Sequence, residues 1–404
     1  MSPVLHADVL IVGGGLVGAA TAFHLRAQHA MSVVLLERDR VGSQASGVNF
    51  GNVRRQGRFL PQLPLAHRAR AIWGQLGRLL GDDCEFMATG HVKVAYDDAE
   101  LGELERWAAE ARHWDLHIEM LGANTLRARY PWLGRDVVGA GHSPEDGHAN
   151  PRLVAPAFAR AARRLGATIL EHTTATSLER DGTGFRVLGE RGVQMRARVL
   201  VNAAGAWGGR IAQQFAEPVP IEARGPQMSV TEPLPYFIAP VLGTASAKIY
   251  ARQVTRGNVV FGGGERVAVQ MDPPRARVLP ERMHAQWPEL LRLVPGLRGA
   301  QVLRTWSGVE GYLSDMLPVL GPSAGVPGLL HGFGFSGHGF QLGPGVGAVL
   351  AELAATGTTS TPIDAFGIAR FLADSRAAQR PFASQDAAVR HTDASPQRSL
   401  PAQG

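Results

Sequence analysis

Three glycines near the start of the chain have the spacing that binds a nucleotide pyrophosphate. Residues 13–18 read Gly-Gly-Gly-Leu-Val-Gly, which matches G-x-G-x-x-G, and Glu37 follows 19 residues after Gly18. In this pattern the first glycine makes a tight turn, the second lets the backbone approach a pyrophosphate, and the third lets a helix pack on a strand. An acid about 20 residues later is placed to bind ribose hydroxyl groups. We therefore expect a dinucleotide at this turn.

The elements around this turn are those that such a site requires. Residues 8–12 form a short apolar run typical of a buried parallel strand, residues 19–28 are predicted to be a helix, and residues 32–37 a second strand. The N-terminus of the helix would offer unpaired N–H groups and partial positive charge to phosphates. A glycine turn that serves packing alone is the alternative, but this order of elements favours a nucleotide.

The residues that follow distinguish between the dinucleotides. Arg38 could pair with a 2′-phosphate, but an acid at the ribose position argues against NADP. Residues 42–52 are rich in small and polar residues, whereas an NAD enzyme would usually have an ordinary helix there. We expect a loop under a larger cofactor, with Ser46, Asn49 and Asn52 able to hydrogen-bond it. The sequence therefore favours FAD.

A second glycine-rich stretch lies at residues 332–347, with seven glycines in sixteen residues and His338 as its one histidine. Its three phenylalanines are too apolar for a solvent-exposed linker. We predict a turn from a strand into a helix that begins after Pro344. Such a turn leaves backbone N–H groups free to approach a ligand, and the positive end of the helix would stabilise a negative charge in front of it.

Composition limits the other possibilities. The chain has 404 residues, of which 45% are hydrophobic, enough for a large core divided between two domains. Lys and Arg exceed Asp and Glu by 41 − 35 = 6, but the arginines are scattered, so we expect no nucleic-acid partner. The lone cysteine, Cys84, excludes an intrachain disulfide and a Cys-rich metal site. No apolar run reaches the roughly 18 residues of a membrane span, so we expect a cytoplasmic protein without a metal or a transmembrane segment.

The order of the predicted elements indicates an α/β fold, α+β overall, in which a Rossmann-type FAD-binding domain is interrupted by a substrate domain with a mixed antiparallel sheet. We assign residues 1–86, 146–222 and 318–374 to the FAD-binding domain. Residues 87–145 and 223–317 are assigned to the substrate domain, and residues 375–404 to a C-terminal tail that we expect to be mobile, because it is rich in Ala, Ser, Gln and Pro without periodicity.

With these pieces placed, the chain resembles the D-amino-acid oxidase and sarcosine oxidase family of flavoproteins. The resemblance covers most of residues 8–372 and rests on seven motifs in order. They are GGGLVG with Glu37, SGVNFGN at 46–52, DGHANP at 146–151, NAAGAW at 202–207, RGPQ at 224–227, WSGVEGYLSDMLPVLG at 306–321 and GFSGHGFQLGPGVG at 334–347. Within the family, the chain is similar to the small subunits of opine oxidases and to the β-subunits of heteromeric sarcosine and hydroxyproline dehydrogenases.

The resemblance implies extended FAD, with the substrate above its ring in a pocket under the strand-rich domain. It also implies that the C-terminal glycine-rich turn lies against the cofactor, where the positive end of its helix would stabilise the negative charge that grows on the flavin as it accepts hydride. A hydride would move from the carbon next to nitrogen to flavin N5, leaving an imine that water hydrolyses. Monomeric sarcosine oxidases attach the flavin to a cysteine near the C-terminal motifs, and Cys84 lies in another segment, so we expect non-covalent binding. We assign the cofactor contacts to Gly13, Gly15, Leu16, Val17, Gly18, Glu37, Arg38, Ser46, Gly47, Asn49, Gly51, Asn52, Ala175, Ala204, Gly205, Trp207, Gly334, Ser336, Gly337, His338, Gly339, Phe340 and Gln341.

The resemblance also places the substrate carboxylate on a basic loop. Sarcosine oxidases carry a carboxylate-binding arginine there, so Arg54 or Arg55 is the candidate, in a loop that also contains Arg58. A solvated surface loop is the alternative. Tyr250 and Tyr312 lie on segments expected near the pocket and could bind or enclose the substrate, although an aromatic residue is as readily explained by packing.

Two departures from the family bear on the substrate. Gln341 stands where some sarcosine oxidases have a carboxylate-binding lysine, and Glu310 stands where glycine and D-amino-acid oxidases have an arginine clamp. A buried carboxylate needs a cation, so Glu310 would suit a substrate amine or the guanidinium of an arginine-derived opine; a salt bridge with an arginine such as Arg304 is the alternative. His338 would tune the charge of the flavin ring, contact the substrate or be structural. We take His338, Gln341 and Glu310 as the candidates for catalysis.

The electron acceptor is left open by the sequence. The family's oxygen-activating lysine would fall near residues 261–264, and none is present there. O2 remains possible, and so does a second cofactor, a quinone or a partner subunit, which would make the protein a dehydrogenase. Phe366, Phe371 and Phe382 are consistent with a partner subunit, and a homo-oligomer is the other possibility.

Overall fold

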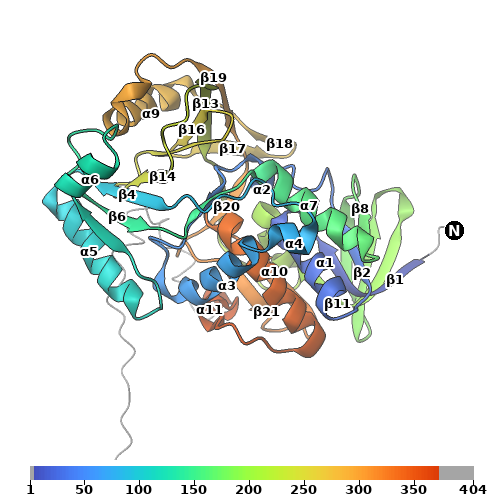
Figure 1. Ribbon diagram of the computed structural model, residues 1–404. Helices are drawn as coiled ribbons and strands as arrows, with labels where there is room; N and C mark the ends of the chain where they lie inside the picture. Colours follow the sequence, from blue (N-terminus) through green and yellow to red (C-terminus); the bar gives the residue numbers. More distant parts are fainter. Residues whose placement is uncertain (1–3, 373–404) are drawn as a thin grey trace, which may run out of the picture.

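The computed structural model describes residues 4–372, and its first sheet carries the nucleotide turn (Figure 1). The strands of this sheet are β1 (Val4–Val12), β2 (Val33–Leu36), β8 (Thr168–Leu170), β9 (Ala175–Asp181), β10 (Gly184–Gly189), β11 (Gln194–Asn202), β21 (Val319–Pro322) and β22 (Leu329–Phe333). The strand order is β21-β22-β11-β1-β2-β8, with β10 and then β9 added beside β11. Strands β22, β11, β1, β2 and β8 are parallel, as in a dinucleotide-binding fold.

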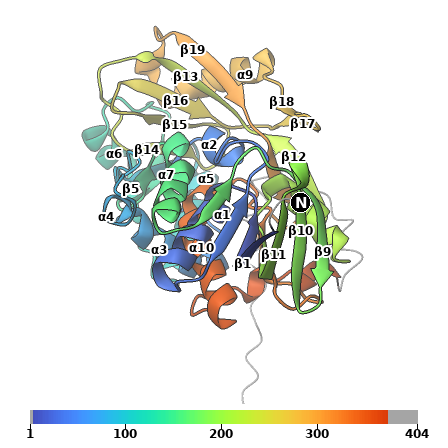
Figure 2. The ribbon, with the colours of Figure 1, turned by 90° about the vertical axis from the view of Figure 1, so that its right-hand side faces the viewer.

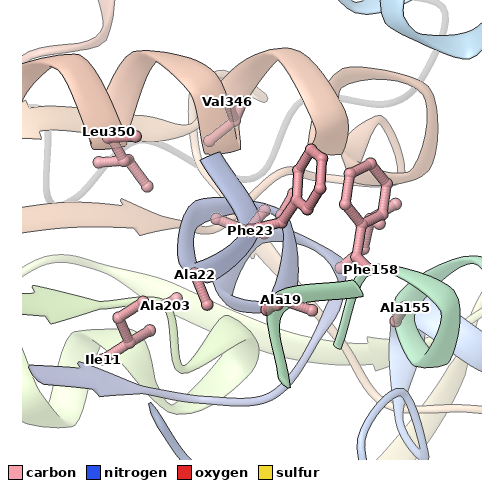
Figure 3. Close-up of a cluster of buried hydrophobic side chains, with 14 of the residues drawn as sticks. Ile11, Ala19, Ala22, Phe23, Ala155, Phe158, Ala203, Val346 and Leu350 are labelled. Carbon is pink, nitrogen blue, oxygen red and sulfur yellow. The ribbon is translucent and has the colours of Figure 1, made fainter. Parts of the chain in front are cut away.

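Three helices cover one face of this sheet. They are α1 (Leu16–Gln28), α7 (Pro151–Arg164) and α10 (Gly339–Thr356). Figure 3 shows Phe23 of α1 facing Phe158 of α7, with Val346 of α10 on another side of α1, and the two phenylalanine ring centroids are 5.6 Å apart. A Cβ at Gly347 would overlap Ala20, so the small residues of α1 and α10 allow these helices to pack closely.

A second large sheet is built from two distant segments of the chain. Its strands are β4 (His91–Ala95), β5 (Glu119–Gly122), β6 (Gly139–Ser143), β13 (Gln227–Pro233), β14 (Val241–Thr244), β15 (Tyr250–Gln253), β16 (Asn258–Gly262) and β19 (Val302–Ser307). The order is β19-β13-β16-β15-β14-β4-β6-β5, antiparallel except for the β14–β4 pair. Figures 1 and 2 both show β13, β16 and helix α9 (Pro280–Leu293) above the first sheet.

Smaller elements connect the two sheets. A four-stranded sheet has the order β18-β17-β12-β20 and consists of β12 (Ile221–Gly225), β17 (Val267–Met271), β18 (Pro274–Ala276) and β20 (Glu310–Leu313). Strand β3 (Asn52–Val53) pairs with β7 (Gly147–His148). The remaining helices are α2 (Ala45–Val48), α3 (Leu63–Trp73), α4 (Leu76–Leu80), α5 (Asp98–Arg112), α6 (Ala123–Arg129), α8 (Gly208–Gln214) and α11 (Ala369–Leu372), with short 3-10 turns η1 (Leu60–Gln62), η2 (Glu190–Gly192), η3 (Gly205–Trp207), η4 (Pro295–Leu297) and η5 (Asp364–Phe366).

The predicted fold class is confirmed, while the domain boundaries stay a prediction.

One expected helix start is wrong: α10 begins at Gly339, and Pro344 lies inside it. Proline removes one N–H and fixes φ near −65°, so this helix accepts it at the expense of the bond to the carbonyl four residues earlier. None of the helices in residues 4–372 is long and apolar enough to cross a membrane.

The aromatic residues expected to serve a partner near the C-terminus are used within the chain. Phe366 is fully buried in the main core, and Phe371 is 6% exposed and packs with Leu313 and Phe333. These two are therefore not available to a partner subunit. Phe382 and the tail predicted at 375–404 lie outside the described residues.

Candidate active site

A cavity of about 1320 Å³ extends from the nucleotide turn to the glycine-rich C-terminal turn. Its walls include residues of both large sheets and of the two glycine-rich turns. Of the predicted cofactor contacts, all but Gly18 and Gly47 line this cavity. These two glycines serve packing. A Cβ at Gly18 would overlap the carbonyl oxygen of Gly13, and a Cβ at Gly47 would overlap that of Gly42.

The nucleotide turn is held open by glycine geometry and braced by the predicted acid. Gly13 has a φ of +112°, and a Cβ there would overlap the carbonyl oxygen of Ala203. Glu37 Oε2 accepts a hydrogen bond from Gly14 N at 2.7 Å, and its Oε1 accepts one from Asp39 N at 2.9 Å. Burial raises the pKa of the Glu37 carboxyl, and these two N–H donors oppose the increase. The acid therefore shapes the turn while it lines the cavity.

Two polar side chains near this turn carry hydrogen-bonding atoms without a partner in the described chain. The Arg38 guanidinium lies 3.6 Å from the centroid of the Trp207 ring. Arg38 Nη2 and Trp207 Nε1 are both buried donors without a hydrogen bond, and both residues line the cavity. Because buried donors are normally satisfied, these atoms indicate a polar ligand at this end.

The loop at 42–52 uses most of its polar side chains to hold itself in place. Asn49 Nδ2 donates to the carbonyls of Ala45 and Ser46, both at 2.9 Å, and its Oδ1 accepts from Gly51 N at 2.8 Å. Ser46 Oγ accepts from Leu16 N at 2.8 Å. Asn52 differs, because its Oδ1 is buried without a partner. Of the three side chains predicted to bind the cofactor, Asn52 is therefore the one left with an unsatisfied atom.

The glycine-rich turn between β22 and α10 forms the opposite end of the cavity. His338 is the N-cap of α10, its Nδ1 is buried without a partner, and its carbonyl accepts from Arg58 Nη1 at 3.3 Å. Burial, followed by the nearby arginines, lowers the pKa of His338 well below its usual range, so the imidazole is neutral near pH 7. Gln341 Nε2 donates to Ala66 O at 2.8 Å, while its Oε1 is buried without a partner.

The basic loop separates into a structural arginine and two cavity arginines. Arg55 does not line the cavity: its Nε donates to Asp146 Oδ1 at 3.0 Å and its Nη2 to Glu145 Oε2 at 2.8 Å. Arg54 and Arg58 do line it. Arg54 donates to the carbonyl of Gln56, and Arg58 Nε to the carbonyl of Arg54 at 3.0 Å. Of the two predicted candidates, Arg54 therefore lines the cavity and Arg55 does not, and Arg58 of the same loop lines it as well.

An acidic and aromatic cluster faces the glycine-rich turn. Tyr312 OH donates to Glu310 Oε2 at 2.7 Å, and the Arg266 guanidinium lies 4.1 Å from the centroid of the Tyr312 ring. Burial raises the pKa of the Glu310 carboxyl. The alternative salt bridge to Arg304 is not formed, because Arg304 is exposed on β19 and does not line the cavity. Tyr250 lines the same region, and burial raises the pKa of its hydroxyl.

Comparison with known proteins identifies the family. The family model described as "FAD dependent oxidoreductase" matches residues 8–353. The chain belongs to this family. The opine oxidase B-subunit of Rhizobium meliloti is 29% identical over 379 residues, which cover 90% of this chain and 97% of that protein. Glycine oxidase of Geobacillus kaustophilus is 28% identical over 374 residues, again 90% of this chain and 97% of that protein.

A solved structure shares the fold over almost the whole chain. L-proline dehydrogenase from P. horikoshii has a TM-score of 0.85 at 24% identity, covering 92% of this chain and 99% of that one. The family resemblance stated from the motifs, and FAD as the cofactor, are thereby confirmed. This protein is an FAD-dependent oxidoreductase.

The residues present fit FAD. The glycine turn, the unsatisfied donors of Arg38 and Trp207 and the unsatisfied oxygen of Asn52 lie along one continuous cavity that ends at His338. Cys84 is fully buried outside the cavity, and burial raises the pKa of its thiol to about 12. It is therefore unsuited to flavin attachment, and non-covalent binding stays our prediction.

Among the cavity residues that sequence reasoning missed are Arg266, Lys93 and His91. Arg266 follows the glycines of 262–264, where the sequence draws attention only to a missing lysine. Lys93 and His91 lie on β4, and His91 Nδ1 is 2.9 Å from Gln56 Oε1. No local motif marks them, because β4 reaches the cavity through its long-range pairing with β14.

Proposed function

We propose that the protein oxidises the C–N bond of an amino acid or N-substituted amino acid, with preference for a secondary amine. The similarity to glycine oxidase and to proteins named as subunits of opine oxidase and sarcosine oxidase supports this choice. The observation that carries it is a cavity lined by two arginines that form no ion pair within the described residues, the half-buried Arg54 and the buried Arg58, and by a half-buried acid, Glu310. An amino acid has the complementary carboxylate and ammonium groups.

Each of these groups has a defined task in the proposed reaction. Arg54 and Arg58 bind the substrate carboxylate and thereby orient the carbon that is oxidised. Glu310 Oε accepts the ammonium proton, which frees the nitrogen lone pair, and the Tyr312 hydroxyl keeps the carboxylate in position by donating to Oε2. FAD, when bound, supplies the acceptor of the hydride and its two electrons. The substrate becomes an imine, and water then adds to give a carbonyl compound and an amine.

The glycine-rich C-terminal turn would stabilise negative charge on the cofactor through its helix N-terminus and not through a charged side chain. The first turn of α10 lines the cavity, so its N–H groups and partial positive charge would stabilise negative charge on the reduced cofactor. His338 remains neutral because burial and the charge of Arg58 lower its pKa. Gln341 is anchored on Ala66, which leaves its Oε1 as an acceptor rather than a cationic carboxylate ligand.

An anaerobic reduction experiment tests this function. The FAD-loaded protein is mixed with sarcosine, proline, glycine, D-amino acids and N-carboxyalkyl amino acids, and the visible flavin absorbance is followed. We expect at least one amine to bleach the flavin, and Arg58→Met to raise the amine concentration required by about 100-fold. Arg256→Met is the matched control, because Arg256 is 70% exposed and does not line the cavity. Failure of every amine to bleach the wild-type flavin would refute the proposal.

A second candidate is the flavin-bearing subunit of a heteromeric amine dehydrogenase. Two similar proteins, those of opine oxidase and sarcosine oxidase, are named as subunits of their enzymes. The protein reduced by its amine is mixed either with air-saturated buffer or with an artificial electron acceptor. Rapid reoxidation by O2 assigns an oxidase, whereas slow reoxidation by O2 with rapid reoxidation by the artificial acceptor assigns a dehydrogenase.

A further inference from the structure

Three arginines line the cavity near the glycine-rich turn between β22 and α10 without forming an ion pair with an acid of the described chain. Arg54 and Arg58 donate to backbone carbonyls, and Arg266 stacks on the Tyr312 ring. Arg266 Nη2 is buried without a hydrogen bond. None of the three forms an ion pair within residues 4–372, whereas Arg55 pairs with two acids. Arg58 is buried, and Arg54 and Arg266 are half-buried. A cation removed from water is costly until an anion reaches it, so these arginines have capacity for an anionic ligand.

The three arginines approach the glycine-rich turn from different elements. Arg54 and Arg58 come from the loop after β3, and Arg266 comes from the loop between β16 and β17. Arg58 Nη1 donates to the carbonyl of His338 at 3.3 Å, and Arg58 Nε donates to the carbonyl of Arg54 at 3.0 Å. Tyr312 lies between Arg266 and Glu310, because the Arg266 guanidinium is 4.1 Å from its ring centroid and its hydroxyl donates to Glu310 Oε2 at 2.7 Å. The acid and Arg266 therefore belong to one cluster around the Tyr312 ring.

The cavity charges are unequal at this end. The wall at this end holds four basic side chains, those of Arg54, Arg58, Arg266 and Lys93, and the acid Glu310. Asp315, another acid of the wall, is already paired with Arg370 at 2.7 Å. An amino acid with one carboxylate leaves an arginine without an anion. A substrate with a second carboxylate would satisfy both arginine sites.

Building on the function proposed above, we propose that the substrate is an amine that carries two carboxylates. One carboxylate binds Arg54 and Arg58, the second binds Arg266, and the amine binds Glu310. Oxidation breaks a C–H bond next to nitrogen, with the hydride going to the flavin and the ammonium proton to Glu310. Water then converts the imine into an oxo acid and an amine. N-carboxyalkyl amino acids and acidic amino acids both have this chemistry.

Two inert ligands test the second carboxylate without turnover. Diglycolate has two carboxylates and an ether oxygen in place of the amine, and methoxyacetate lacks the second carboxylate. Their binding to the FAD-loaded protein is measured from the shift of the visible flavin spectrum. We expect diglycolate to bind about 10- to 100-fold more tightly. Arg266→Gln should abolish the difference, Arg266→Lys should restore part of it, and the control Arg256→Gln should keep it.

The FAD content and melting temperature of each variant are measured alongside, so that a folding defect is recognised. Equal binding of the two ligands by wild-type protein would overturn the proposal. Retained discrimination in a folded Arg266→Gln protein would also overturn it. A lower FAD affinity in that variant with unchanged discrimination would place the guanidinium on the cofactor and not on substrate.

Reduction of the flavin by amines separates this proposal from the broader amine oxidation function. It also distinguishes an N-carboxyalkyl amino acid from an acidic amino acid as the substrate. Iminodiacetate and aspartate are isomers that differ in whether nitrogen lies between the carboxylates, and sarcosine and glycine are the monocarboxylate comparators. Faster anaerobic reduction by either dicarboxylate supports the proposal, and the better isomer identifies the source. Reduction by sarcosine or glycine at the same rate would refute it while the amine oxidation function stands. Diglycolate binding with no reduction by any amine would refute the function instead.

Discussion

The ion pair between Arg55 and Asp146 leads to a quantitative prediction about the stability of the basic loop that contains Arg54, Arg55 and Arg58. Asp146 is fully buried, and it accepts hydrogen bonds from Arg55 N at 2.8 Å, Arg55 Nε at 3.0 Å and Gln56 N at 3.1 Å. Asp146→Asn removes the charge and replaces one acceptor oxygen by an NH2 group that faces a donor. Breaking a buried pair from one side costs about 3–5 kcal/mol of the free energy of unfolding. Because the amide keeps one acceptor oxygen, we expect a loss of about 3 kcal/mol.

The chain offers a matched control on the same arginine. Glu145 also pairs with Arg55, but its side chain is 66% exposed, whereas that of Asp146 is 0% exposed. Glu145→Gln should therefore cost less than about 1 kcal/mol. Urea unfolding of both variants at one fixed FAD concentration measures the difference, since FAD binding itself adds to apparent stability. Equal losses in the two variants would contradict the view that burial of the carboxylate determines its contribution.

Three further outcomes follow from the cavity. Glu310 must be ionised to accept a proton, and burial raises its pKa, so the rate of flavin reduction should fall as the pH drops through that raised pKa. Glu310→Gln should lower the rate by about 100-fold and remove this fall at low pH, and stopped-flow absorbance measures both effects. Arg38→Met should weaken FAD binding by about 10-fold in a flavin fluorescence titration, and unchanged affinity would exclude the nucleotide role of its unsatisfied Nη2. Gly13→Ala should prevent FAD binding, because its Cβ would overlap the carbonyl of Ala203, while Gly122→Ala, with open space around the new Cβ, should leave FAD binding unchanged.

The parts of the site that the sequence predicts well are those encoded locally. The turn at 13–18, its flanking strands and Glu37 lie within one β-α-β unit, so spacing alone places them. The start of α10 is misplaced from the sequence because proline favours the first helical position, while five helical residues precede Pro344. Local patterns thus indicate which elements form, but less reliably where each begins.

The parts that the sequence leaves open depend on distant partners. Arg54 and Arg55 are neighbours of the same type, and only Asp146, 91 residues beyond Arg55, shows which of them is held away from the cavity. Arg266 shows the same limit, because its position depends on β17 pairing with β12. No window of sequence around either arginine contains this information.

Arginines have two roles in this protein, a structural one and one in ligand binding, and the presence of an acid partner within the chain decides between them. Where a buried carboxylate is supplied by the chain, as Asp146 is for Arg55, the ion pair fixes the loop and leaves no capacity for a ligand. Where the chain supplies only backbone carbonyls or an aromatic face, as for Arg58 and Arg266, the guanidinium keeps its capacity for an external anion. Because Asp146 also accepts from the backbone N–H groups of Arg55 and Gln56, the structural pair positions the loop whose neighbouring arginines face the cavity. A change at Asp146 should therefore alter amine binding as well as stability.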